Sequence, residues 1–217
     1  MLRCGKKTNK KEQNKENNVK TKISTNKQQV ILASSSETRK NQLKQFIDKF
    51  TVEKHRIDEQ KYKRETAKPK ELVSKLAQKK AESIKDLYPR GVIIGSDQIL
   101  ICDSRLIDKP TNLKEAKNNL MNLRNKMHIL MSSIYVLNNG DFFFQKTKQA
   151  ELFFKNINEK QIDSYLKDNE KTALSSVGSY RIEDNDQYKF LDIISGDRET
   201  ILGFPIKDFM EKVSKNE

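Results

Sequence analysis

The 217-residue sequence lacks the features that mark membrane-spanning and disulfide-rich proteins. No segment approaches the roughly 18 consecutive apolar residues that a membrane span requires, and the first residues lack the apolar centre of a secretory signal. Its two cysteines, Cys4 and Cys102, have neither metal-ligand spacing nor further cysteines with which to build a disulfide framework. We therefore expect a reduced, cytoplasmic protein that does not associate with membranes.

Negative charge is scarce at the start of the chain. The formal net charge of the whole sequence is +13. Residues 1–29 hold nine Lys and Arg against two Glu, with only three aliphatic side chains. Such a stretch buries too little apolar surface to offset the entropy lost on ordering. We expect residues 1–28 to be a disordered basic tail, either simply solvated or serving as a nucleic-acid or targeting arm. Residues 29–217 are expected to form the folded domain.

The remainder of the sequence alternates strand signals with helix signals. Apolar positions at helical spacing predict helices over residues 37–50, from Pro69 to about Leu87, over 113–123, around 162–166 and from near Pro205. Short apolar runs predict strands in QQVILASSS, VIIGSD, QILICD and LDIIS, and residues 128–155 predict a hairpin that turns at Asn-Asn-Gly. This mixture predicts an α/β domain with a mixed sheet flanked by helices.

Charged and hydroxyl side chains occur at the predicted ends of these strands and helices. Asp97 closes the most apolar strand, and ligands of open α/β sheets bind beyond such ends. Three serines precede Arg39 and Lys40 in the turn SSSETRK, at the start of a helix. Cations there oppose the helix dipole, a penalty that an anionic ligand would reverse. The alternative is a serine cap followed by ordinary surface charges.

Three further charges fall at informative positions. Lys80 lies on the apolar stripe of its helix, so its ammonium must either reach solvent or meet an anion. Lys109 precedes Pro110, which forces an extended backbone and fixes the direction of the lysine. Glu59 follows a weak strand signal and could equally be a loop charge. Carboxylates beside such cations are typical of sites that hold Mg²⁺ and hydrolyse phosphate esters or anhydrides.

The order and spacing of several motifs resemble those of the Maf-like nucleotide pyrophosphatases over about residues 29–212. This sequence contains LASSSETRKNQL, Asp58-Glu59 and AQKKA, which resemble the family motifs LASxSPRRxxLL, DE and AxxKA in that order. Two later motifs are similar to IIGSDQILICDSRLIDKP and GSYRIEDNDQYKFLDIISGDRETILGFP. The resemblance implies a Maf/ITPase-like fold with a central substrate cleft. It also implies hydrolysis of a nucleoside triphosphate to the monophosphate and pyrophosphate.

The resemblance further implies roles for single residues. Asp97 corresponds to the general base, and Glu59 and Asp97 lie near a divalent cation, Mg²⁺ or Mn²⁺. The residues implied to contact phosphate are Arg39, Lys40, Lys80 and Lys109. The other residues implied to bind substrate are Ser34, Ser36, Thr38, Glu59, Gln98 and Glu183. We also expect a homodimer.

Two residues favour a guanine-type base. In the resembling family, Gln after the catalytic Asp accompanies 7-methyl-GTP hydrolysis and Thr accompanies dTTP or UTP hydrolysis, so Gln98 implies the first. A carboxylate at Glu183 only accepts hydrogen bonds, and guanine offers donors at N1 and N2. Glu37 replaces the usual Pro, and Thr38 stands where that branch often has Trp. A pyrophosphatase acting on dTTP or UTP and a catalytically weakened nucleotide or nucleic-acid binding module are the alternatives.

Overall fold

The computed structural model of the protein describes residues 28–215, so the basic tail expected over residues 1–28 lies almost wholly outside the described residues. None of the described helices combines the length and the apolar composition needed to cross a membrane. The elements, in chain order, are β1 (Val30–Leu32), α1 (Glu37–Lys44), β2 (Thr51–Val52), α2 (Glu59–Glu65), α3 (Pro69–Glu82), η1 (Lys85–Leu87), β3 (Val92–Cys102), β4 (Arg105–Ile107), α4 (Leu113–Leu123), β5 (Lys126–Asn138), β6 (Asp141–Phe154), α5 (Glu159–Asp168), α6 (Glu170–Ser175), η2 (Val177–Ser179), η3 (Ile182–Asp184), α7 (Asn185–Tyr188), β7 (Leu191–Ser195), α8 (Arg198–Ile201) and α9 (Lys207–Ser214).

A mixed sheet forms the centre of the described region, as the sequence predicted. Its seven strands run in the order β2-β1-β3-β5-β6-β7, with β4 pairing onto β3. β1 is parallel to β2 and to β3, and every other pair is antiparallel. The predicted hairpin is β5 and β6, and positive φ angles at Asn139 (53°) and Gly140 (83°) match the two-residue turn that such strands favour. Helices flank this sheet, so the predicted fold class is confirmed.

The prediction of two separate strands in VIIGSD and QILICD was wrong, because both segments belong to one strand. β3 continues through these residues and pairs with β5 from Val92 to Ile101. Gly95 is needed for a close approach and not for a turn. A Cβ atom there would lie 2.2 Å from the Ala77 carbonyl oxygen and 2.8 Å from the Ala81 nitrogen. The glycine therefore lets α3 pack directly on β3.

The other edge of β3 is open at its centre. β1 pairs only with Val92–Ile94 of β3, and β4 pairs only with Leu100–Cys102. Between them, residues 95–99 have no strand neighbour on this edge among the described residues. Asp97 lies in the middle of this gap, so it occupies the interior of its own strand but lies beyond the end of the adjacent β1.

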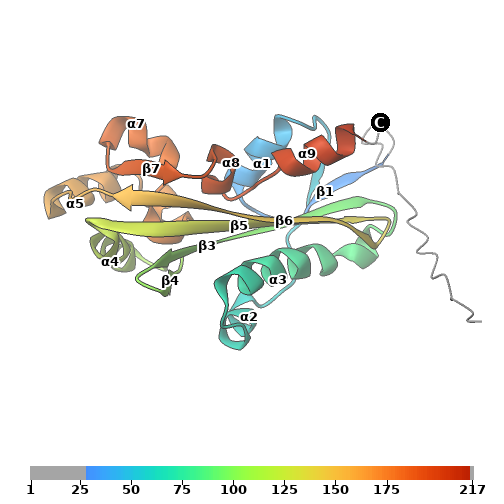
Figure 1. The fold of residues 1–217 in the computed structure, drawn as a ribbon, viewed down its shortest axis with the longest axis horizontal. Helices are drawn as coiled ribbons and strands as arrows, with labels where there is room; N and C mark the ends of the chain where they lie inside the picture. Colours follow the sequence, from blue (N-terminus) through green and yellow to red (C-terminus); the bar gives the residue numbers. More distant parts are fainter. Residues whose placement is uncertain (1–27, 216–217) are drawn as a thin grey trace, which may run out of the picture.

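Helices cover both faces of the sheet near this gap. Figure 1 shows α3, with α2, on one face of the long strands, and α1, α8 and α9 on the other. Ile93 packs with Ala77 and Ala81 of α3, whereas Val92 and Ile94 pack with Leu43 and Phe209 on the opposite side. The alternation of side chains along β3 therefore sends Asp97 to the face that carries α3.

Two predicted helices end earlier than expected. α1 ends at Lys44, and the amides of Phe46 and Ile47 then bond to the carbonyl of Leu43, which turns the chain and returns Ile47 to the core. α3 ends at Glu82 and tightens into η1, which leaves Leu87 47% exposed although the sequence placed it on the apolar stripe.

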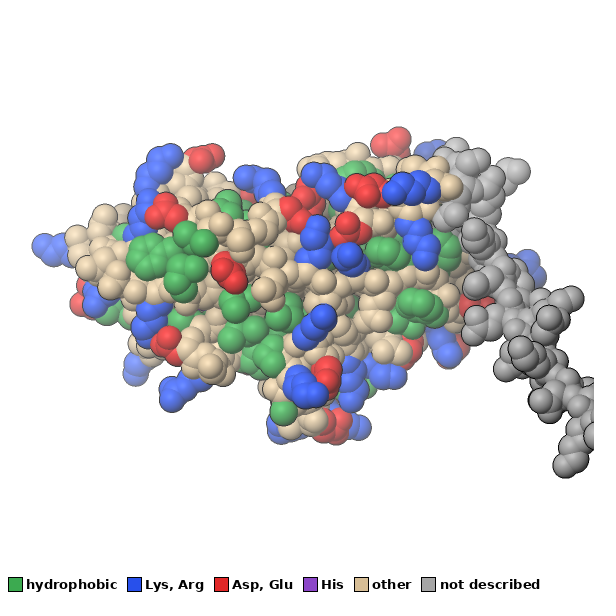
Figure 2. Space-filling view, in the orientation of Figure 1, with side chains coloured by type: hydrophobic (Ala, Val, Ile, Leu, Met, Phe, Trp, Pro, Cys, Tyr) green, Lys and Arg blue, Asp and Glu red, His purple; other side chains and the backbone are tan. Residues whose placement is uncertain are grey.

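The far end of the sheet has its own core. There α4, α5 and α6 pack with the ends of β5 and β6 around an aromatic cluster whose members include Phe154, Tyr165, Tyr180 and Phe190. Figure 2 shows a group of hydrophobic side chains at the end that carries β7 and another near the middle of the same face, with basic and acidic side chains around both. The cleft described next lies between this far end and the part built on β1, α1 and α3.

Candidate active site

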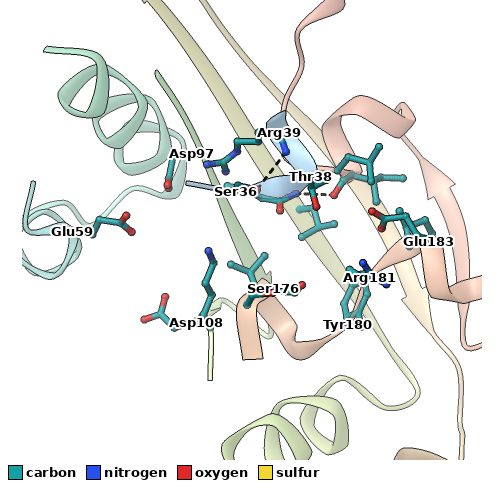
Figure 3. Close-up of a pocket in the computed structure, with 18 of the residues that line it drawn as sticks. Ser36, Thr38, Arg39, Glu59, Asp97, Asp108, Ser176, Tyr180, Arg181 and Glu183 are labelled. Atoms are coloured by element: carbon teal, nitrogen blue, oxygen red, sulfur yellow. Dashed lines mark hydrogen bonds between the residues drawn. The ribbon is translucent and has the colours of Figure 1, made fainter. Parts of the chain in front are cut away.

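A cleft of about 340 Å³ opens beside the gap in β3. One wall, which we call the charged wall, carries Arg39, Glu59, Lys80, Asp97 and Lys109. The opposite wall, which we call the nucleoside wall after the ligand that the sequence resemblance implies, consists of residues 175–177, 180–183 and 201–202. In Figure 3, Asp97 and Glu59 lie on one side of the cavity, and Tyr180, Arg181 and Glu183 lie on the other. The volume lies in the range of small-molecule sites.

Lys80 joins the two carboxylates of the charged wall. Its ammonium lies 2.5 Å from Asp97 Oδ1 and 2.9 Å from Glu59 Oε1, and Lys80 itself is only 4% exposed. The contact at Gly95 brings this turn of α3 against β3, so the lysine meets the carboxylate one side chain further along the same face. Of the two alternatives for Lys80, the structure confirms that it meets an anion.

Glu59 begins a helix and is not a loop charge. It is the first residue of α2, and the side chain of Asp58 caps that helix by accepting from the Gln60 amide. Its carboxylate also lies 3.3 Å from Nε2 of His55. The hydrogen bond from His55, and then the charge of Lys80, hold the pKa of Glu59 well below its usual range in spite of partial burial. Glu59 is therefore an anion at neutral pH.

Arg39 is fixed by backbone carbonyls. Its Nε donates to the Gly203 carbonyl at 3.0 Å, and its Nη1 donates to the Ser96 carbonyl at 3.0 Å. Burial lowers the pKa of Arg39, and the negative charges of Asp97 and Glu59 oppose that shift. The guanidinium thus keeps one position in the cleft.

The serines before α1 shape its first turn. The Ser36 hydroxyl caps the helix by accepting from the Arg39 amide at 3.4 Å (Figure 3), and the Ser34 hydroxyl accepts from the Ser36 amide at 3.2 Å. Ser36 and Thr38 line the cleft, whereas Ser34 does not. Lys40 also lies outside the lining and forms an exposed ion pair with Glu37 at 3.5 Å.

Lys109 is the last member of the charged wall. It lies next to an ion-pair bridge between Lys63 and Asp108, both of which line the cleft. Exclusion of water lowers the pKa of Lys109, and the nearby cations Arg39 and Lys80 lower it further. The adjacent Asp108 accepts from Lys63 of α2 at 2.5 Å, and its carbonyl accepts from Asn119 at 3.1 Å. The bridge fixes the backbone from which Lys109 extends.

Sequence reasoning missed most of the nucleoside wall, apart from Glu183. Tyr180 is buried, and its hydroxyl lies 2.5 Å from Nε2 of the buried His128 on β5. Arg181 forms two hydrogen bonds with Asp184, the shorter at 2.6 Å. The sequence signal for this wall was the GSYRIE segment, but only the folded structure shows that the segment lies opposite β3.

Comparison with known proteins fits this architecture. Residues 29–216 match the family model described as Maf-like protein. The chain belongs to the Maf-like family.

Curated relatives of this Maf-like chain have printed names that describe triphosphate hydrolysis. The nucleoside triphosphate pyrophosphatase of Paramagnetospirillum magneticum is 34% identical over 86% of this chain and 97% of its own length. That of Pelagibacter ubique is 32% identical over 84% and 95%. The 7-methyl-GTP pyrophosphatase of Bartonella henselae is 32% identical over 85% and 93%.

The carboxylates of this Maf-like chain have the donor chemistry that a divalent cation prefers. Lys80 binds one oxygen of Asp97 and one of Glu59, and among residues 28–215 the second oxygen of each has no hydrogen-bond partner. The described residues contain no group of three or more potential metal ligands. Mg²⁺ is commonly held by one or two carboxylates together with substrate phosphates. The pair therefore fits a cation that arrives with, and is completed by, a phosphorylated ligand.

Proposed function

We propose that this protein is a nucleoside triphosphate pyrophosphatase, which releases the monophosphate and pyrophosphate. The observation that carries the proposal is the buried Lys80, which pairs with both Glu59 and Asp97 at the edge of the cleft, beside Arg39 and Lys109. The three cations and two carboxylates of the charged wall suit a polyanionic substrate whose phosphate charge is shared between the protein and a divalent cation.

The cations bind and orient the triphosphate. The carbonyls of Gly203 and Ser96 hold the Arg39 guanidinium in place before substrate arrives, so little side-chain entropy remains to be lost on binding. Lys109 follows the end of β4, and the contacts of Asp108 with Lys63 and Asn119 anchor its backbone. Positioned charges of this kind stabilise the charge that develops on transferring phosphoryl groups.

Water is the nucleophile, and Asp97 is the base. The free Asp97 oxygen accepts a proton from water as the water oxygen bonds to phosphorus and the α–β anhydride P–O bond breaks. Pyrophosphate leaves, and the water supplies the new oxygen. Lys80 orients the Asp97 carboxylate through its other oxygen. Glu59 and Asp97 would hold the divalent cation, Mg²⁺ or Mn²⁺, whose chemistry is to neutralise phosphate charge and polarise the P–O bonds.

The proposed base is guanine, most specifically 7-methylguanine. Glu183 lines the nucleoside wall, and its carboxylate makes no hydrogen bond or ion pair with any other residue in the described part of the chain. It is therefore available to accept from the N1 and N2 donors of guanine. Two relatives bear the name 7-methyl-GTP pyrophosphatase, which supports this choice. Thr38 offers no aromatic face for a cationic base, so we assign discrimination between bases to Glu183.

A panel assay tests the proposal. Pyrophosphate release is measured for 7-methyl-GTP, GTP, UTP and dTTP with Mg²⁺ or Mn²⁺, and Asp97→Asn serves as the inactive control. We expect turnover with at least one guanine triphosphate and a dependence on the added cation. Triphosphate binding without turnover on any member of the panel would instead favour the binding-module alternative. Glu37 gives that alternative little support, because it is 75% exposed and pairs with Lys40.

A further inference from the structure

The nucleoside wall includes a short segment whose position depends on the side chain of Gln98. α8 ends at Ile201, and Ile201 and Leu202 both line the cleft. Nε2 of Gln98 donates to the Thr200 carbonyl at 3.1 Å and to the Ile201 carbonyl at 2.9 Å. Gln98 lies on β3, so one amide group ties the central strand to the end of this helix.

The partners of the Gln98 amide fix its orientation. Both acceptors are carbonyl oxygens, and the reversed amide would bring Oε1 against them, so the nitrogen must face α8. Oε1 instead lies beside Gly203, where a Cβ atom would approach it to 2.9 Å. With both N–H groups used inside the protein, the nitrogen has none left to donate to a substrate.

Three other side chains also hold this segment. The Ser132 hydroxyl donates to the same Thr200 carbonyl at 2.8 Å, and Ser132 is fully buried. The Ser96 hydroxyl and Arg39 both donate to the Gly203 carbonyl at 3.0 Å. Carbonyls at the end of a helix need such partners because the helix itself supplies none.

We propose that Gln98 is a positioning residue, which holds Thr200–Gly203 so that Ile201 and Leu202 form a fixed apolar surface for the nucleoside. Gln98 therefore acts on substrate binding through this surface, and its amide nitrogen does not bind the base. The role in substrate binding rests on the proposed function, whereas the hold on the segment does not.

Hydrogen exchange without substrate tests the hold on the segment. The amides of Leu202, Gly203 and Phe204 are all hydrogen-bonded to carbonyls within this turn, so they report its opening. We expect Gln98→Met to lower their protection by about tenfold, from the loss of two ordinary hydrogen bonds. Ser132→Ala should lower protection of the same amides by a smaller factor, and the combined variant by less than the product of the two. Unchanged protection in Gln98→Met would overturn the proposal.

Kinetics of the same variants test the role in substrate binding. We expect Gln98→Met to raise KM about five- to tenfold for every nucleoside triphosphate, with kcat within about twofold of wild type. Ser132→Ala should raise KM in the same direction, although Ser132 does not line the cleft. A residue that contacted the base directly would change one base class alone and leave Ser132→Ala silent, which would refute the proposal. A merely structural residue would lower kcat at constant KM. If the wild type releases no pyrophosphate from any triphosphate, the proposed function fails and exchange alone decides the role of Gln98.

Discussion

The two walls of the cleft are built in different ways. Charges of the charged wall pair with one another across distant elements, as Lys80 of α3 does with Asp97 of β3 and Glu59 of α2. The nucleoside wall rests instead on the aromatic core through Tyr180. Its Glu183 makes no hydrogen bond or ion pair within residues 28–215, although its charge acts on the neighbouring Arg181. A wall with paired, fixed charges suits the triphosphate that all substrates share. A wall with an unpaired acceptor suits the base, which varies among them.

If this division holds, substitutions in the charged wall should affect all substrates equally. Asp97→Asn should have the largest effect, a loss of about 10²- to 10⁴-fold in kcat for every triphosphate, because Asn cannot take the proton from water. The fold should survive, since Asn is nearly isosteric and Lys80 keeps Glu59 at 2.9 Å. Pyrophosphate release and thermal unfolding measure the two effects. Turnover near that of the wild type would contradict the role of Asp97.

Lys80→Met should have the second-largest effect, and this effect should be a loss of stability. Removing the ammonium leaves Asp97 buried without its cation, and breaking a buried pair typically costs about 3 to 5 kcal/mol. Because Glu59 is partly exposed, we expect a loss near the lower limit, about 3 kcal/mol in the free energy of unfolding, measured in urea at pH 7. Adding Asp97→Asn should recover much of it.

A surface pair provides the matched control for Lys80. Lys117 bridges Glu159 and Asp163 with about a third of its side chain exposed, so Lys117→Met should cost less than about 1 kcal/mol. Equal losses in the free energy of unfolding for Lys80→Met and Lys117→Met would show that the buried pair stabilises the fold no more than a surface pair does. The contrast between the walls would then have no basis in stability.

Local patterns were enough to predict much of the charged wall. Lys80 was identified because a cation on an apolar stripe must either reach solvent or meet an anion, and the structure supplies two anions. Asp97 was identified by a rule about strand ends, although its strand continues for five residues beyond it. The rule still found the gap, because the neighbouring strand β1 ends opposite Ile94, before Asp97 is reached. Register between strands decides this, and no local pattern contains it.

The nucleoside wall could not be predicted in the same way. Tyr180 and His128 are 52 residues apart, and their contact depends on how the far-end helices pack on β5 and β6. The Gln98 amide binds carbonyls 102 and 103 residues away, for which a residue type alone gives no signal. Helices and the hairpin followed from periodicity and turn residues, whereas these contacts depend on tertiary packing.

Glu183→Gln should change selectivity without changing the common chemistry. An amide would place an NH₂ group against a guanine donor, so kcat/KM for GTP relative to UTP should fall about 10- to 100-fold, or roughly 1.5 to 3 kcal/mol. The fall should be larger for 7-methyl-GTP, whose ring is positively charged. Measuring kcat/KM for these substrates and dTTP decides it. An equal fall in kcat/KM for all four triphosphates would mean that Glu183, like the charged wall, serves every substrate and does not select the base.

Acid should separate the two walls by stability. His128, which holds the Tyr180 hydroxyl, is buried, and burial lowers its pKa from 6.5 to about 4. Between these two values the unfolded chain binds a proton that the folded chain does not, so stability falls as pH falls through this window. The lowered pKa of Glu59 contributes stability that is lost only below the usual carboxylate range. Above pH 5, the pH dependence from these two groups should therefore come from His128.

His128→Gln should remove that dependence while keeping a hydrogen-bonding group near Tyr180. Linkage gives a loss of about 2 kcal/mol for the wild type between pH 7 and pH 5 from this histidine, and none from glutamine. Urea unfolding of both proteins at pH 7, 6 and 5 measures the difference, and the variant should be the less stable protein at pH 7 but approach or exceed the wild type at pH 5. Parallel curves for the two proteins would mean that His128 titrates normally in the folded state. The nucleoside wall would then be no more sensitive to acid than the charged wall, and the contrast between them would rest on selectivity alone.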